Sequence, residues 1–194
     1  VKYTNVIMDD AVAAMVSGSV VAGEFWEPFG SKVLSTLPGS KVMATSKDPY
    51  FKKTALLGDG MYMSEKFLKE RPDAAKLVMQ AYCEAVKYWK ENPKEANEIM
   101  AKGLGFSVED VELVIGKDGS ATDGGIYPFD LAEAAKFMGV MNGEPPFGAN
   151  NEITRHWDLT TEWWLKFGMV KKPFPMKAGI DLAPIKAVVS EEAD

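Results

Sequence analysis

Signals that start and stop α-helices crowd the chain from residue 61 onward, and they constrain its fold more than any other feature. Ser64 is predicted to cap a short helix that ends before Pro72. Pro72 suits the first turn of the next helix, where Asp73 favours the positive N-terminal end. That second helix has an apolar stripe at spacings of three and four residues, formed by Ala74, Leu77, Val78, Ala81, Ala85, Tyr88 and Trp89.

Similar helix start and stop signals occur further along the chain. Asn92 and Pro93 are a predicted cap and a first-turn proline, and the helix that they open is expected to end at Gly103. Ser107 is predicted to open another helix in the same way. Two more helices are expected, over residues 130–138 and over residues 152–167, where Gly168 closes the helix.

The first 60 residues follow a different pattern, in which short β-rich runs alternate with one short helix. Asp9 is predicted to cap that helix, which stops at Gly18. Strands are predicted at residues 3–8, 20–25 and 41–45. A strand–helix–strand order is typical of a mostly parallel sheet, so the expected fold class is α/β.

Composition and charge exclude some classes of function. The chain has 194 residues, 46% apolar and 26% charged, which is ordinary for a globular protein with a hydrophobic core. No run approaches the ~18 consecutive apolar residues of a membrane-spanning helix. The net charge is −6 and the longest basic block is Lys171-Lys172, so no nucleic-acid partner is expected. The chain starts at Val1 without a signal-peptide pattern, and we expect a removed leader or a fragment of a longer protein.

Few residues in the sequence suit catalysis. The one histidine, His156, has no second histidine or nearby cysteine, and it is interpreted as a packed or exposed helix residue. Cys83 is interpreted as a small buried apolar residue and not as a nucleophile. The glycine-rich segments lack the Lys-Ser/Thr pair of a phosphate-binding loop. We therefore expect no catalytic residue, no metal site and no cofactor.

The segment from Gly18 to Phe29 says most about function. Glu24, Trp26 and Glu27 lie at the carboxyl end of a predicted strand, which is the edge where open α/β sheets bind ligands. There Trp26 would offer a flat stacking surface, and a carboxylate would accept hydrogen bonds from a ligand. The alternative is that Trp26 fills the core and Glu27 is solvated, and physical arguments favour the two interpretations equally.

Several segments, in their order and spacing, resemble the substrate-binding proteins of the nitrate, sulfonate and taurine ABC importers. They are the helix 11–18 with Ser19 to Ala22, the run Trp26-Glu27-Pro28-Phe29, and residues 66–73, 92–96 and 163–170. The resemblance covers nearly the whole chain. It implies a type II periplasmic-binding-protein-like fold and a binding protein that is not an enzyme.

The chain departs from the family pattern in two ways. Val21 stands where the family motif Gly-x-Val-Asp-Ala has its aspartate, and the family's N-terminal portion is absent. The resemblance then implies an incomplete fold, with residues 1–44 as the rest of an α/β second lobe. Residues 45–194 would be the crossover and the helix-rich C-terminal part of the first lobe. Because a cleft needs two walls, another chain or a missing N-terminal segment is expected to complete it.

The resemblance implies a periplasmic or extracytoplasmic receptor that closes two lobes around a small molecule and presents it to an ABC permease. Nitrate, sulfonate or taurine, bicarbonate and pyrimidine-like solutes are the candidate ligands. The candidate ligand-binding residues are Trp26, Glu27, Glu24, Asp9, Thr45 and Ser46. Asp9 is also explained, more simply, as a helix cap.

Two other functions remain open at this stage. The first is a ligand-sensing or regulatory module with the same fold. The second is an enzyme similar to the thiamine-pyrimidine synthases, which use a histidine with a cysteine-rich segment. One histidine, one cysteine and no cysteine cluster disfavour the enzyme.

Overall fold

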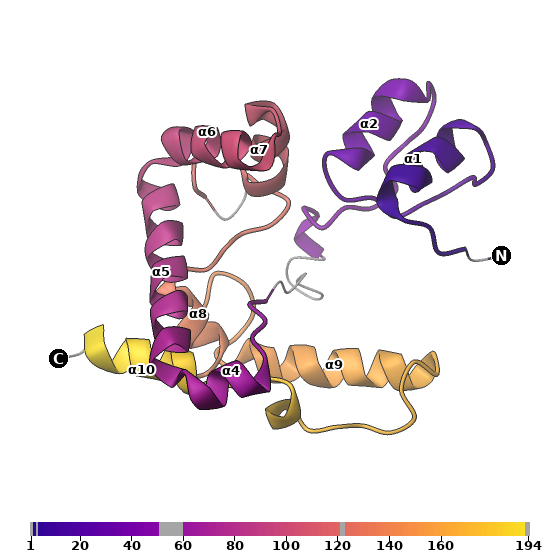
Figure 1. Cartoon of the computed structure of the whole chain (residues 1–194). Helices are drawn as coiled ribbons and strands as arrows, with labels where there is room; N and C mark the ends of the chain where they lie inside the picture. Colours follow the sequence, from indigo (N-terminus) through magenta and orange to yellow (C-terminus); the bar gives the residue numbers. More distant parts are fainter. Residues whose placement is uncertain (1, 3, 51–59, 121–122, 193–194) are drawn as a thin grey trace. The chain divides into compact units, whose positions relative to one another are not determined.

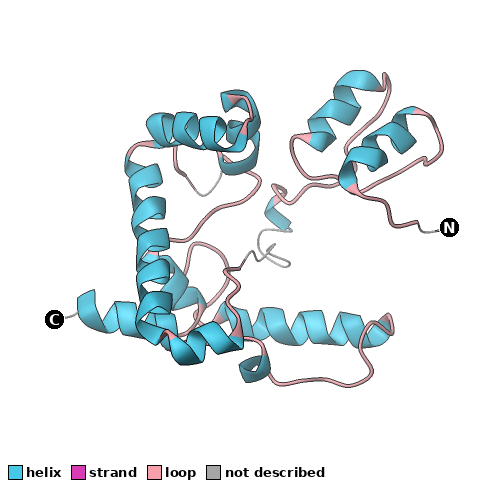
Figure 2. Ribbon diagram, viewed as in Figure 1, coloured by secondary structure: helices cyan, strands magenta, loops and turns pink. Residues whose placement is uncertain are grey.

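The computed structural model describes residues 2, 4–50, 60–120 and 123–192 (Figure 1). The chain divides into two compact units, which are described separately below. The first unit contains residues 1–47 and 93–127, and the second contains residues 48–92 and 128–194. Both units are built of helices and loops within the described ranges (Figure 2).

The expectation of an α/β fold is wrong, because the described residues contain helices and no strand. The described parts of the segments 3–8, 20–25 and 41–45 carry no strand pairing. Each segment is five or six residues long, and so few short strands are marginal without further partners to pair with. Their apolar side chains also have little to pack on, since Val21 is 92% and Met43 is 94% exposed. The assignment of residues 1–44 and 45–194 to two lobes stays a prediction.

The N-terminal part of the first unit is a helical pair, α1 (Met8–Val16) and α2 (Phe29–Thr36), in contact with each other. Each helix buries one residue, Val12 in α1 and Val33 in α2. The prediction that Asp9 caps the first helix is wrong. Ile7 occupies the cap position without a side-chain hydrogen bond, and Asp9 lies in the first turn, where a carboxylate favours the helix dipole. The helix α2 was not expected from the sequence.

The rest of the first unit is a second helical pair, α6 (Pro93–Leu104) and α7 (Val108–Ile115). The predicted cap is confirmed, since the Ser107 hydroxyl accepts a hydrogen bond from the Asp110 amide at 3.1 Å. Asn97 is only 1% exposed, and its side-chain amide donates to the Gly116 carbonyl at 2.8 Å. This bond satisfies a carbonyl at the C-terminal end of α7 from inside α6.

The second unit begins with α4 (Glu65–Glu70) and α5 (Pro72–Glu91), which contact each other. Both predicted starts are confirmed. The Ser64 hydroxyl accepts from the Phe67 amide at 3.1 Å, and Pro72 is the first residue of α5. A proline at that position loses no hydrogen bond, since the first amides of a helix have no partner within it.

The core of the second unit lies where α10 (Ala183–Glu192) meets α5 and α8 (Leu131–Phe137) (Figure 1). Cys83 is buried there, as interpreted from the sequence. The buried cluster consists of Cys83, Leu131, Ala135, Ile185 and Val188. This cluster holds the unit together, because burial of each large apolar side chain contributes about 1.5–3 kcal/mol.

The long helix α9 (Glu152–Lys166) completes the second unit with the short 3₁₀ turn η1 (Met176–Ala178). At its start the buried Glu152 carboxylate accepts from the Ala149 amide at 2.9 Å and pairs with Arg155. The Trp157 indole donates to the Phe174 carbonyl at 2.9 Å, which ties the segment after α9 back to the helix. None of the described helices is both long enough and apolar enough to span a membrane.

Candidate functional site

The segment that carries Trp26 and Glu27 forms the entry to α2. Amides of Phe29 and Gly30 donate to the Trp26 carbonyl at 3.0 and 3.2 Å, so the chain turns tightly there. The Glu27–Pro28 peptide bond in this turn is cis. The Trp26 ring is 64% exposed and meets Phe29 edge-on, with 6.3 Å between the ring centroids. Trp26 therefore presents an accessible aromatic face and does not fill the core.

The Glu27 carboxylate lies over the first turn of α2. Its Oε2 atom accepts from the Ser31 amide at 3.1 Å, so it satisfies one unpaired amide and complements the positive end of the helix dipole. The carboxylate also packs against Gly30, where a Cβ atom would lie at an ordinary contact distance of 3.6 Å from Glu27 Oε1. The partly buried carboxylate is thus held in place beside the exposed indole.

Glu24 and Asp9 occupy other positions in the same unit. Glu24 is exposed two residues before Trp26, and Asp9 is exposed in the first turn of α1. Glu24 adds a second carboxylate close in sequence to the indole, whereas Asp9 is explained by its place in α1. The role of each in ligand binding stays a prediction.

Thr45 and Ser46 lie on the segment that leads out of the first 47 residues. The Ser46 hydroxyl donates to the Gly125 carbonyl at 3.3 Å, and the Lys47 ammonium donates to the Asp123 carbonyl at 3.4 Å. The Thr45 hydroxyl accepts from the Lys47 amide at 3.3 Å. These contacts attach the segment to the loop that follows α7, and they differ from those of Trp26 and Glu27.

That loop is itself closely packed against the end of α7. The Asp123 carboxylate accepts from the Lys117 amide, and the Ile126 amide donates to the Val114 carbonyl at 3.0 Å. A side chain at Gly124 would overlap the backbone of Ile115. The described residues 123–126 thus offer Ser46 and Lys47 a packed surface to bind.

His156 in the second unit packs against an aromatic ring. Its ring packs edge-on against Phe137, and its Nε2 atom is buried without a hydrogen-bond partner among the described residues. Burial lowers the pKa of His156, the Arg155 charge lowers it further, and Glu152 opposes both. A neutral, packed helix residue is the role that these contacts support.

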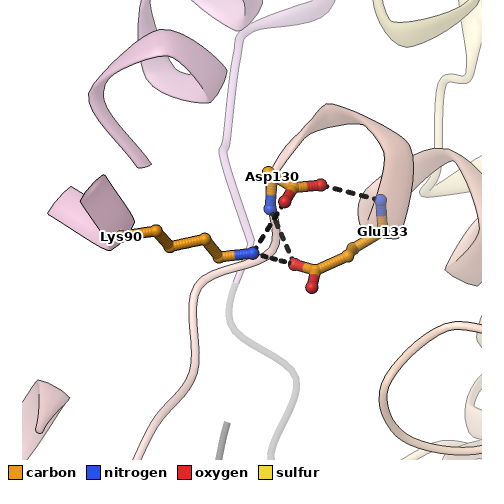
Figure 3. Close-up of polar contacts among 3 residues, drawn as sticks. All are labelled: Lys90, Asp130 and Glu133. Carbon is orange, nitrogen blue, oxygen red and sulfur yellow. Dashed lines mark hydrogen bonds and ion pairs between the residues drawn. The ribbon is translucent and has the colours of Figure 1, made fainter. Parts of the chain in front are cut away.

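A cluster of charges that the sequence did not reveal links α5 to the start of α8 (Figure 3). The Lys90 ammonium lies 2.7 Å from Asp130 Oδ2 and also pairs with Glu133. Asp130 and Glu133 form a capping box, in which each side chain accepts from the other residue's amide. The spacing Asp-x-x-Glu before an apolar run would have indicated the box, but nothing in the sequence indicates Lys90.

Among the described residues, no group of three or more histidines, cysteines or carboxylates could hold a metal ion. The first unit offers different chemistry. The exposed face of Trp26 would stack on a flat solute. The positioned carboxylate of Glu27 and the second carboxylate of Glu24 would accept hydrogen bonds from it.

Comparison with known proteins identifies a family but no individual relative. No curated protein and no solved structure matches the chain. The model of the NMT1-like family matches residues 1–105, more than half of the chain, and the matched part contains both Trp26 and Ser46. This match confirms the resemblance to the nitrate-, sulfonate- and taurine-binding proteins. The chain therefore belongs to the NMT1-like family, which indicates a solute-binding protein of the ABC-importer kind.

Proposed function

We propose that this protein is the solute receptor of an ABC importer and that it binds a planar, pyrimidine-like solute on Trp26. The observation that carries the proposal is the exposed Trp26 ring beside the positioned Glu27 carboxylate, within the residues that the family model matches. The proposal includes an extracytoplasmic location and delivery of the solute to a membrane permease.

The charges around Trp26 favour a pyrimidine-like solute over the other candidates. Nitrate, sulfonates and bicarbonate are anions, and Glu24 and Glu27 would repel them. A pyrimidine that carries amino groups is neutral or cationic, and its flat ring matches the indole face. Stacking of this kind contributes about 0.5–1.5 kcal/mol beyond the area that it buries.

Glu27 would select for hydrogen-bond donors on that solute. Only Oε2 is engaged by the Ser31 amide, and a carboxylate has four acceptor positions on its two oxygens. A ligand amino group would therefore bind Oε1 while the carboxylate keeps its contact with α2. A charge-assisted bond of this type is roughly twice as strong as a neutral one.

Titration calorimetry and tryptophan fluorescence with an aminopyrimidine, nitrate, taurine, an alkyl sulfonate and bicarbonate test the proposal. We expect saturable binding of the aminopyrimidine, without turnover, and weak or no binding of the anions. Trp26→Ala should weaken binding at least tenfold, or about 1.4 kcal/mol. Trp164→Ala changes an exposed tryptophan of the other unit and should leave binding unchanged.

A preference for nitrate, taurine or bicarbonate would contradict the pyrimidine assignment while keeping the receptor. Turnover of the solute would contradict the receptor itself. Equal losses in Trp26→Ala and Trp164→Ala would show that Trp26 does not contact the ligand.

A further inference from the structure

A basic stretch free of carboxylates follows the middle of α9. Residues 163–180 contain four lysines and no aspartate or glutamate, although the whole chain has a net charge of −6. Three of these lysines, Lys166, Lys171 and Lys172, lie within a seven-residue span and are exposed. This part of the molecule is therefore positive on an otherwise acidic protein.

The same stretch exposes an unusual concentration of apolar side chains. Trp164, Leu165, Phe167 and Met169 are all exposed, and Phe167 reaches 69%. Singly exposed apolar residues are normal, but a contiguous group is a mark of an interaction surface. We call residues 163–172 the α9 tip.

Aromatic and basic groups are interleaved in the α9 tip. The Trp163 and Phe167 rings are stacked with 5.6 Å between centroids, and the Lys166 ammonium lies 4.3 Å from the Trp163 ring centroid. The Lys166 charge thus lies over the face of the Trp163 ring, at a distance typical of a cation–π contact.

The α9 tip is held at a distance from the core of its own unit. Figure 1 shows the C-terminal end of α9 and the loop after it well away from α5, α8 and α10. Gly168 turns the chain with a positive φ of 69°, and the Met169 amide donates to the Trp164 carbonyl at 2.8 Å. Contact between Trp157 and Phe174, with centroids 5.2 Å apart, anchors the returning segment. The exposed side chains therefore lie on a defined turn.

We propose that the α9 tip docks on the surface of an anionic phospholipid bilayer. Tryptophan and phenylalanine insert at the boundary between headgroups and acyl chains, and lysines beside them contact anionic headgroups. Glu162 is exposed one turn before Lys166, but Lys166, Lys171 and Lys172 outnumber it. This excess of lysines complements a uniformly negative surface, which favours a bilayer over a protein partner of mixed charge. The inference stands apart from the solute proposal, because the α9 tip lies outside the residues matched by the family model.

Co-sedimentation with vesicles tests the proposal on the intact chain. We expect binding to vesicles of equal parts phosphatidylglycerol and phosphatidylcholine, little binding to phosphatidylcholine alone, and weakening by added salt. Tryptophan emission should shift to shorter wavelength on binding, as the indoles leave water.

Charge variants assign the binding to the α9 tip. The triple change Lys166→Gln, Lys171→Gln and Lys172→Gln should reduce partitioning about a hundredfold, at about fivefold for each lysine from ~1 kcal/mol per cation. The matched control changes three exposed lysines of α5 and α6, Lys87→Gln, Lys94→Gln and Lys102→Gln, and should lose much less.

An apolar variant tests insertion separately from charge. Trp164→Ser with Phe167→Ser should weaken vesicle binding and reduce the emission shift, to which Trp163 still contributes. The circular dichroism of the chain should stay unchanged, because both substituted side chains are exposed. Equal binding to neutral and anionic vesicles, or equal losses in the two lysine triples, would overturn the proposal. So would concentration-dependent dimerisation that the Trp164→Ser, Phe167→Ser variant removes, since the α9 tip would then bind a second copy.

Discussion

The α5–α8–α10 core and the α1–α2 pair show two ways in which a helical segment uses its apolar residues. In the core, side chains from three helices converge on one buried cluster, with Ala135 fully buried and Ile185 only 4% exposed. In the pair, each helix buries a single valine, and the flanking segments leave residues such as Ile7 and Val21 exposed. The apolar side chains of the core are buried by this chain itself, whereas several apolar side chains around the pair stay exposed.

The helices α4, α7 and α8 begin differently from the α1–α2 pair. Ser64, Ser107 and Asp130 each accept a hydrogen bond at the start of a helix outside the pair. The cap residues of α1 and α2 accept no such bond through their side chains, and the same holds for α5 and α9. A helix with a good cap and a buried stripe is specified twice, locally and by packing, whereas α1 and α2 depend on fewer interactions.

The largest expected effect follows from this difference in burial. Ile185→Ala removes a large side chain from the cluster and should destabilise the second unit by about 2–5 kcal/mol. Val33→Ala in the pair should cost less, because Val33 packs in a smaller buried set. Urea unfolding, followed by hydrogen exchange of the two regions, measures both. If Val33→Ala proved the more damaging of the two, the contrast between the regions would be wrong.

A smaller effect is expected at the charge cluster of the second unit. Lys90→Met would leave the half-buried Asp130 and Glu133 without their cation, at a cost of about 1–3 kcal/mol. Lys69→Met is the matched control, because its pair with Glu65 is exposed and should contribute nothing measurable. Similar losses in the two variants would refute a special role for the cluster.

The cluster also predicts how stability depends on pH. Burial raises the pKa of Asp130, but hydrogen bonds from Lys90 and from the Glu133 amide outweigh it, and the net pKa is lowered. The resulting stability is complete above the ordinary aspartate pKa of about 3.9 and is lost as pH falls through the lower folded value. In Lys90→Met, acid unfolding should therefore begin at a higher pH, which circular dichroism would detect.

The smallest effects concern the caps. Ser107→Ala should cost about 1 kcal/mol by removing the bond to the Asp110 amide. Ile7→Ser would place a capping hydroxyl before α1, three residues ahead of Asp10, and should stabilise that helix by a few tenths of a kcal/mol or more. Thermal unfolding of the two variants measures these opposite shifts. Stabilisation by Ser107→Ala would contradict the assigned cap.

Much of the helical part was predictable because its signals are local. Ser64, Ser107 and Asp130 accept from amides three residues further along, and Pro72 suits the first turn of its own helix. These roles can therefore be read from the sequence. The strands were predicted wrongly for the opposite reason. A β-rich run becomes a strand only where another strand pairs with it, and the described residues provide no such partner.

The candidate site was predictable only in part. The aromatic and acidic character of Trp26 and Glu27 was apparent from the sequence. The structural setting of these two residues was not apparent, because the segment predicted as a strand edge leads into the start of α2. The contact between Ser46 and Gly125 joins residues 79 positions apart, and the pairing of Lys90 with Asp130 spans 40. Such partners depend on how helices pack, which no local pattern encodes.

The glycines of the first unit bear on how this sequence tolerates change over evolution. Any side chain at Gly124 would collide with the backbone of Ile115, and backbone atoms cannot move aside as a flexible side chain would. Gly103, within α6, has open space where a Cβ would lie, and alanine there would favour the helix. We expect relatives of this protein to keep glycine at position 124 and to carry various residues at position 103. A member with a larger residue at 124 would have rebuilt the turn that holds Ser46 and Lys47.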